Sequence, residues 1–452
     1  MRRVTVVALL TLGLLSLGAG LAAPAGAASI GPDIEKVLNR ALPSDATGVA
    51  TTPGGGAAYV CGTRIFINHG TDVTVDRVGS SPWAKYWNGP ADKNDRANDV
   101  AVSAKGHVYV VGSSQKANGD YRALLLKYSA TGTLLWARTW AGPTGSSPSG
   151  YRVAIDTKGR VVVVGQLKVK TATHVFVAQY SAAGKRLWAR INSTGYMGHM
   201  RDIYLDGSNN IYVAGGCQAT GTSSMNGLLL KYSDAGTLRW RKTYDSPYKK
   251  YDEYLAVCRR PGGGVYVAGG SGHTNSDSDG IVMRYSATGT RTVVARIGDG
   301  DGAYMGLYDA VVTSDGRLVV GGSTSVGSGD SDFVIYSLNA AGDTVWSHIY
   351  DSGYMLSRSE RCEFLAAYGD GQVAASGFWA RHASGDEYPQ VARTHFFDAA
   401  GSIVDTSTWD GPVTGETEVH DMVAKGSYVW IAGQCFGDAP YMSDGFALRF
   451  DR

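Results

Sequence analysis

A short run of β-branched and aromatic residues that ends on glycine recurs eight times along this chain. The copies are AAYVCG at 57–62, HVYVVG at 107–112, RVVVVG at 160–165, NIYVAG at 210–215, GVYVAG at 264–269, RLVVGG at 317–322, QVAASG at 372–377 and YVWIAG at 428–433. Successive closing glycines are between 50 residues (Gly62 to Gly112) and 56 residues (Gly377 to Gly433) apart. A period of this length is typical of repeat architectures, in which one supersecondary unit is copied along the chain.

Each unit is predicted to contain four strands. In residues 98–140 a short alternating strand is followed by the glycine-ended strand, a polar loop, an apolar strand at 123–128 and a fourth strand at 133–140. Turns rich in Gly, Ser, Asn and Asp join them, which indicates one antiparallel sheet. Such a small sheet must bury both faces against its neighbours, and radial packing around an axis achieves this in a β-propeller. We therefore predict an all-β propeller of four-stranded blades, with eight blades as the first choice and seven as the alternative.

The last unit is one strand short. It stops at its third strand, residues 446–452, so a ring would have to borrow a strand from the other end of the chain. Residues 29–41 are the only spare segment, although residues 33–42 look more helical than extended. The predicted organisation is a signal peptide at 1–27, a lead segment at 28–43 and the propeller at 44–452.

The first residues carry an export signal. Arg2 and Arg3 precede an apolar stretch from Val4 to Leu21 and a run of small residues at 25–27, the pattern of a cleaved secretory signal. No later segment approaches the ~18 consecutive apolar residues of a membrane span. We therefore expect a secreted, extracellular monomer with no membrane span.

Charge and cysteine spacing argue against a nucleic-acid-binding protein and against a zinc-binding protein. Without the two leading arginines the formal net charge falls from +2 to zero, and basic residues are interspersed with acidic ones, so no nucleic-acid-binding stripe is present. The five cysteines form no C-x-x-C pair, which gives no support to zinc binding. We predict a disulfide between Cys61 and Cys435, because both lie near the end of a second strand, one in the first unit and one in the last; the sequence alone leaves the connectivity open.

A tryptophan spacing links the chain to known propellers. A glycine stands four residues before tryptophan in five units, at Gly79/Trp83, Gly132/Trp136, Gly184/Trp188, Gly236/Trp240 and Gly342/Trp346. The stretch 178–188 resembles the tryptophan-docking motif of quinoprotein-type propellers, with Tyr180 and Ala183 where that motif usually has Asp and Thr. The YVAG strands, with Asp at the start of third strands, are more similar to the secreted bacterial β-propeller repeat family. That resemblance covers residues 44–452 and implies the fold, but it implies no activity, since this fold hosts unrelated functions.

The repeated residues are assigned to the scaffold. Tryptophans that follow the period of the fold are expected to pack between neighbouring blades. Asp279, Asp332 and Asp444, at the start of third strands, are expected to bond local backbone. Another group of four aspartates begins the first strands of alternate units, and hydrogen bonds between blades explain them at least as well as a ligand. They are Asp99, Asp202, Asp309 and Asp421.

The search for catalytic motifs is negative. The chain contains no H-E-x-x-H, G-x-S-x-G, phosphate-binding or dinucleotide-binding sequence. It also lacks the adjacent Cys-Cys pair of quinoprotein active sites. The string 275–280 has oxygens at alternate positions as in a calcium loop, but Ser286 stands where the closing carboxylate is needed. No catalytic residue, metal ligand or cofactor is assigned.

Ligand contact is expected where the copies diverge. The segments joining a fourth strand to the next first strand lie at the mouth of a propeller, where ligands usually meet the fold. The residues that break the repeat there are Tyr196, His199, Arg201, Tyr304, Tyr354, Arg361, Glu363 and His420. Tyrosines beside charged groups suit sugars or peptide side chains. We therefore predict a non-catalytic binding or interaction module for a glycan or a cell-surface protein. The alternative is an extracellular enzyme, a glycan lyase, glycosidase or quinoprotein-like oxidoreductase, whose carboxylates would have to converge at the mouth.

Overall fold

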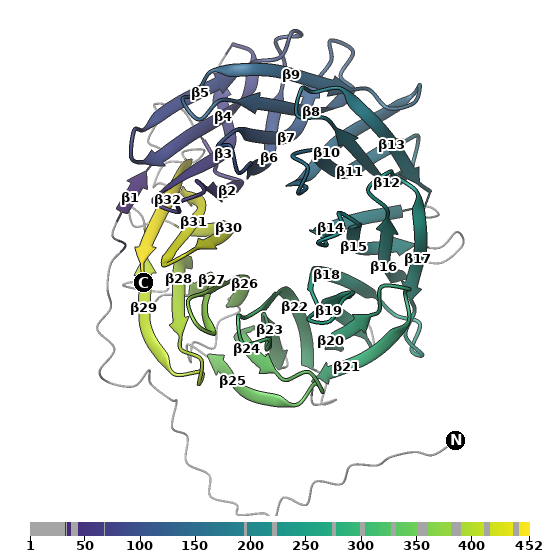
Figure 1. The fold of residues 1–452 in the computed structure, drawn as a ribbon, viewed down its shortest axis with the longest axis vertical. Coiled ribbons are helices and arrows are strands. Elements are labelled where there is room, and N and C mark those ends of the chain that lie inside the picture. Colours follow the sequence, from purple (N-terminus) through teal and green to yellow (C-terminus); the bar gives the residue numbers. More distant parts are fainter. Residues whose placement is uncertain are drawn as a thin grey trace, which may run out of the picture.

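The chain forms a closed ring of antiparallel sheets (Figure 1). The computed structural model describes residues 32, 34–37, 44–66, 68–193, 197–218, 224–273, 277–298, 303–326, 331–350, 360–380, 390–410, 416–436 and 443–452. Strands and turns account for these residues, and none of them is helical. The all-β propeller class predicted from the repeats is confirmed. The predicted signal peptide at 1–27 lies outside the described residues.

The strands fall into eight groups of four, which we number blades 1 to 8 in chain order. Blades 1 to 4 consist of β2 (Gly48–Thr51), β3 (Ala57–Phe66), β4 (Gly70–Gly79) and β5 (Trp83–Trp87); β6 (Asp95–Val102), β7 (Val108–Gln115), β8 (Tyr121–Tyr128) and β9 (Leu134–Trp140); β10 (Ser146–Ile155), β11 (Val161–Val169), β12 (Ala172–Tyr180) and β13 (Arg186–Asn192); and β14 (Met197–Leu205), β15 (Ile211–Gln218), β16 (Met225–Tyr232) and β17 (Leu238–Tyr244). The first strand of each blade lies at the axis and the fourth at the rim (Figure 1).

The second half of the ring repeats the same order. Blades 5 to 8 consist of β18 (Asp252–Arg259), β19 (Val265–Gly272), β20 (Ser278–Tyr285) and β21 (Arg291–Ile297); β22 (Ala303–Val312), β23 (Leu318–Val326), β24 (Asp332–Leu338) and β25 (Thr344–Tyr350); β26 (Arg361–Tyr368), β27 (Gln372–Ala380), β28 (Gln390–Phe397) and β29 (Ile403–Trp409); and β30 (Thr417–Lys425), β31 (Tyr428–Phe436) and β32 (Ser443–Asp451), completed by β1 (Ile34–Val37). A single parallel bridge between Ser278 and Tyr304 joins blades 5 and 6 into one eight-stranded sheet. The glycine-ended runs are the second strands, as predicted.

The fourth strand of blade 8 comes from the N-terminal side of the chain. β1 pairs antiparallel with β32, from Ile34 opposite Arg449 to Val37 opposite Phe446. The helical expectation for residues 33–42 is therefore wrong over 34–37. Four residues give too short a pattern for periodicity to separate a strand from a helix. Pairing with the open edge of β32 decides the conformation.

The repeated glycines lie opposite a bulge in the first strand of blades 2 to 8. The pairing of first and second strands shifts by one residue opposite the glycine, for example between Leu307 and Asp309 opposite Gly322. A Cβ on Gly322 would overlap the backbone carbonyl oxygen of Gly306, and Gly112 faces the carbonyl of Arg96 in the same way. The glycine therefore makes room for the bulge, which gives the first strands of blades 2 to 8 one extra side chain each at the axis.

Tryptophans fasten blades 1 to 4 each to the next blade at the rim. Trp240 of β17 donates its indole N–H to the Ala287 carbonyl of blade 5 (3.2 Å), and its ring lies against the turn glycine Gly289. The same bond is made by Trp83, Trp136 and Trp188. The predicted packing between blades is confirmed. Val293 takes this position in blade 5 and is half-exposed.

The predicted disulfide is wrong. All five cysteines are free thiols, and Cys61 and Cys435 are both buried. The Cys61 side chain packs in the core between blades 1 and 2, whereas that of Cys435 packs between blades 7 and 8. Each points away from the seam between blades 8 and 1, because alternate residues of a strand face opposite sides of the sheet.

Candidate functional site

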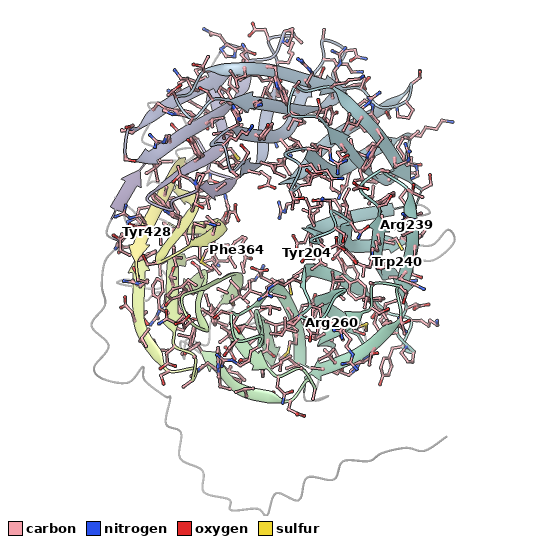
Figure 2. The ribbon with its side chains drawn as sticks, in the orientation of Figure 1. Tyr204, Arg239, Trp240, Arg260, Phe364 and Tyr428 are labelled. Carbon is pink, nitrogen blue, oxygen red and sulfur yellow. The ribbon has the colours of Figure 1, made fainter. Side chains whose placement is uncertain are left out.

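The bulge residues of the first strands line the axis. In blades 2 to 8 they are Asn98, Tyr151, Arg201, Leu255, Tyr308, Glu363 and His420. An axial cavity of about 310 Å³ is lined by five of them, together with residues such as Phe364 and Arg152. Figure 2 shows Phe364 beside the central opening, with Trp240 at the outer rim. These positions hold six residue types in seven blades, with tyrosine at two of them, so this is where one blade can be chemically unlike another.

A second cavity of about 620 Å³ opens at the mouth over blades 4 to 6. Its aromatic lining is Tyr251, Tyr304 and Tyr308, of which Tyr251 and Tyr304 are each 49% exposed. Arg201, Leu255 and Tyr308 line this mouth pocket and also the axial cavity, so the two spaces adjoin. The volume lies within the range of small-ligand sites.

One wall of the mouth pocket is held rigid by a buried carboxylate. Arg201 donates two hydrogen bonds to Glu253, at 2.8 Å to Oε1 and 3.2 Å to Oε2. The Tyr251 hydroxyl donates to the same Glu253 Oε2 at 2.6 Å. The hydrogen bond that Arg201 donates to Glu253 raises the pKa of Arg201, and burial raises that of Tyr251. Tyr308 is fixed from the other side by a 2.9 Å hydrogen bond with the Ser323 hydroxyl. The tyrosine surface is thus preorganised before any ligand arrives.

The opposite side of the axis is charged. Arg361 and Glu363 of β26 face Glu418 and His420 of β30 in the neighbouring blade. His420 lies 3.3 Å from Glu418 through Nε2, and its Nδ1 lies 2.9 Å from the Ala46 carbonyl oxygen. Burial raises the pKa of Glu363 to about 7, while the hydrogen bond from His420 lowers that of Glu418. The mouth therefore has a tyrosine side, formed by Tyr251, Tyr304 and Tyr308, and a charged side, formed by Arg361, Glu363, Glu418 and His420.

The four aspartates of the first strands stand in every second blade, and each joins its blade to the next. Asp309 accepts the backbone N–H of Ala310 and that of Leu365 in the next blade, both at 2.7 Å. Asp99, Asp202 and Asp421 make the equivalent bonds to Val153, Val257 and Val49. The predicted hydrogen bonds between blades are confirmed. Although burial opposes its charge, these four carboxylates raise the pKa of Arg152, the partly buried cation beside them.

The structure brings together some of the predicted contact residues. Arg201 and Tyr304 belong to the mouth pocket, and Arg361, Glu363 and His420 form the charged side. Tyr196 and Tyr354 lie outside the described residues. The backbone of His199 belongs to β14, but its side chain lies outside the described residues.

Sequence reasoning missed Tyr308, Tyr251 and Arg152 as lining residues. Tyr308 is the bulge residue of its first strand, and Arg152 directly follows the bulge residue of its own. Tyr251 directly precedes a first strand. The sequence held a signal for the lining residues. When the eight copies are aligned, the residue just before Asp99, Asp202, Asp309 or Asp421 is the bulge residue of its strand. Without the bulge, strict alternation assigns that residue to the wrong face.

Two searches for other kinds of site found nothing in the described part of the chain. No group of three or more His, Cys, Asp or Glu side chains there is arranged to hold a metal ion. The calcium-like string lies partly outside the described residues, and its Asp279 pairs with Arg296 (2.7 Å) and His273 (2.8 Å). The same part of the chain holds no apolar helix of membrane-spanning length.

Fold and mouth together define a β-propeller with a ligand-sized cleft on its axis. Residues 313–344, which include β23 and β24, match the profile of a family described as "Domain of unknown function (DUF5122) beta-propeller". No curated protein matches the chain.

Several solved structures are weakly similar to this chain. A polysaccharide lyase, Uly1, is 9% identical, with 93% of this chain and 100% of that one covered and a TM-score of 0.47. A puromycin hydrolase mutant complexed with PGG is 14% identical, with 81% of this chain covered and a TM-score of 0.48; this chain spans 54% of its length. The soluble aldose sugar dehydrogenase of Escherichia coli in the apo-form is 14% identical, with 66% and 98% covered and a TM-score of 0.34. These values carry no information on activity.

Proposed function

We propose that this chain is a secreted propeller that binds a carbohydrate in its mouth pocket. The observation that carries the proposal is the set of three tyrosines, Tyr251, Tyr304 and Tyr308, around a cavity of about 620 Å³. Tyrosine rings offer flat amphipathic surface for the faces of sugar rings, and their hydroxyls reach sugar hydroxyls. The charges of the pocket balance, because Arg201 is paired with Glu253. A neutral, hydroxyl-rich ligand fits this lining better than a strongly charged one.

The proposed setting is extracellular. The export signal at 1–27 and the similarity of the YVAG strands to secreted bacterial propeller repeats support it. The protein would act as a monomer, with glycans of its surroundings or of cell surfaces as its partners. Detection of the mature chain in culture medium, starting after residue 27, would support this setting, and retention in the cytoplasm would refute it.

A glycan array of soluble oligosaccharides and polysaccharides tests the binding. Tyr304→Ala and Tyr308→Ala should each weaken retention of the bound glycan at least tenfold, or about 1.4 kcal/mol, because each removes a face of the pocket. Tyr86→Ala is the matched control, since Tyr86 is similarly exposed at 45% but lies on the outer strand β5. Equal retention by all three variants, or no retention of any glycan by the parent, would refute the proposal.

A further inference from the structure

The seam between blades 5 and 6 contains a groove at the rim, which we call the rim groove. Its volume is about 530 Å³. The strands β21 and β25, at the outside of the ring in Figure 1, supply Ile297, Thr344 and Ile349 to its lining, and Arg296 and Met305 also line it. Among the described residues, none lines both the rim groove and the mouth pocket. The rim groove is therefore a cavity with its own walls.

The rim groove opens where blade 5 has short side chains in place of aromatic rings. Rim strands repeat two positions four residues apart, which are Trp240 and Tyr244 in blade 4 but Val293 and Ile297 in blade 5. Among the described rim strands of blades 1 to 7, that of blade 5 alone has no aromatic residue at either position. At the second position the other six have, in chain order, Trp87, Trp140, Asn192, Tyr244, Tyr350 and Trp409.

In two equivalent seams a guanidinium group packs on the aromatic ring at this second position. Between blades 4 and 5, the guanidinium carbon of Arg291 lies 4.9 Å from the ring centroid of Tyr244. Between blades 2 and 3, that of Arg186 lies 5.8 Å from the ring of Trp140. Both arginines stand two residues after a turn glycine, and in blade 6 this place belongs to Thr344, which lines the rim groove. The seam between blades 5 and 6 therefore lacks both the ring and the cation.

The side chains that remain in the rim groove suit an aromatic ring. Arg296 is fixed by a hydrogen bond from Nη1 to Asp279 (2.7 Å) and another from Nη2 to the hydroxyl of Tyr244 (2.9 Å). Its side chain is still 34% exposed. A guanidinium held in this way can pack on the face of a ring. The thioether of Met305 offers a second favourable contact, since sulfur is attracted to aromatic rings.

Exposed apolar side chains flank the rim groove. Val293 of β21 is 50% exposed, and Val345 and Ile349 of β25 are 51% and 55% exposed. Single apolar residues at a surface need no explanation, but a group of them beside a groove is typical of an interaction surface. These three lie on the two rim strands that border the seam without a ring.

We propose that the rim groove is a docking site for a tryptophan or tyrosine side chain of a partner protein. The ring enters beside Ile297, where blades 2 and 4 have a tryptophan and a tyrosine of their own. Arg296 packs on its face, and the exposed Val293, Val345 and Ile349 contact the apolar residues that flank the ring in the partner. The inference goes beyond carbohydrate binding and does not depend on it, because the two cavities share no described lining residue.

Titration of the parent protein with N-acetyltryptophanamide, followed by saturation-transfer NMR, measures docking of the ring. N-acetylleucinamide is the aliphatic probe of similar backbone. The tryptophan probe should bind at least ~fivefold more tightly than the leucine probe, because the guanidinium and thioether contacts need a ring. Equal binding of the two probes, or saturation by neither, would overturn the proposal.

A variant with a filled groove locates the binding. Ile297→Tyr combined with Thr344→Arg rebuilds in this seam the pair that joins blades 4 and 5. It should weaken binding of the tryptophan probe at least ~tenfold, since its own ring takes the space, and it should raise the unfolding temperature because apolar surface becomes buried. Ile349→Ser removes one wall at an exposed site and should weaken binding ~threefold without loss of folding. Val404→Ser, 51% exposed on the rim of blade 7, is the matched control and should bind as the parent does.

The outcomes separate this site from the mouth pocket. Undiminished binding of the tryptophan probe by the filled variant would overturn the proposal. If that variant does not fold, Ile349→Ser decides in its place, and binding equal to that of Val404→Ser would have the same meaning. Glycan retention should be the same in the parent and in the filled variant. Displacement of the tryptophan probe by a bound glycan would place the probe in the mouth pocket and would also overturn the proposal.

Discussion

The most unusual residues of the scaffold are the four aspartates at the axis. Each is partly buried and accepts one backbone N–H from its own strand and one from the next blade, as Asp309 does from Ala310 and Leu365. Burial raises the pKa of Asp99 to about 6 and those of Asp309 and Asp421 to about 7, and Arg152 is a partly buried cation near them. Their spacing in the sequence was enough to predict the hydrogen bonds. Their protonation was not predictable, because it depends on how many other carboxylates share the same axis.

We expect these aspartates to make the ring more stable in mild acid than in base. The pKa of such a carboxyl group is higher in the folded state than in the unfolded state. As pH rises toward about 7, the unfolded state loses its proton before the folded state does, so the stability that the group contributes is lost. Asp309→Asn removes one such group. Compared with the parent, this variant should therefore gain stability between pH 5 and pH 7, by up to about 1.4 kcal/mol per pH unit.

Thermal unfolding of the parent and of Asp309→Asn at pH 5 and pH 8 measures this difference in stability. Titration of Glu363, His395 and His420 changes the stability of both proteins alike, so it cancels in the comparison. Asp370→Asn, in an exposed turn, should show an offset that does not depend on pH. A constant offset for Asp309→Asn would show that the group is ionised at both pH values.

At the scale of strands, the link between blades is a tryptophan in most seams and a valine in one. Trp240 lies between Tyr212 and Tyr285, with ring centroids 5.9 and 6.2 Å away. The glycine-to-tryptophan spacing identified these clips from the sequence, because packing that repeats with the fold leaves a repeat in the chain.

Replacement of the rim side chain by alanine should have different effects at a tryptophan seam and at the valine seam. Trp240→Ala should cost about 2–3 kcal/mol of unfolding free energy, less than a fully buried tryptophan because the ring is partly exposed. Val293→Ala, at the same position of blade 5 and half-exposed, should change it by less than ~0.5 kcal/mol. Urea denaturation with a constant m-value measures both. Similar losses for the two variants would mean that the rim does not hold the blades together.

Other elements could not be predicted from the repeat. The bulge adds one residue to the first strands of blades 2 to 8, so alternation alone misplaces Arg201 and Tyr308. The side on which Cys61 and Cys435 point depends on the parity of each strand, which composition does not reveal. The tyrosine side of the mouth was found only in part, because Tyr251 stands just before its strand rather than at a repeated position.

At the scale of the molecule, the ring depends on one borrowed strand. β1 supplies the outer edge of blade 8 through pairs such as Lys36 with Ala447. A variant that begins at residue 38 should unfold at lower temperature than one that begins at residue 32, since it loses several backbone hydrogen bonds of about 0.5–1.5 kcal/mol each. It should also aggregate more readily, because the edge of β32 becomes available for pairing.

Calorimetry and light scattering on the two truncated chains test this pairing. The variant that begins at residue 32 is the control, since it keeps β1 and loses only the residues before it. Identical unfolding temperatures would show that β1 contributes nothing to the closed ring.

The borrowed strand also sets the order of events during biosynthesis. Residue 34 is among the first parts of the propeller to leave the ribosome, yet its partner, residue 449, is among the last. Joining segments so distant along the chain carries the largest loop-closure entropy in the molecule. Blades formed earlier can pack against their neighbours at once, whereas the seal between the two ends has to wait until translation is nearly finished.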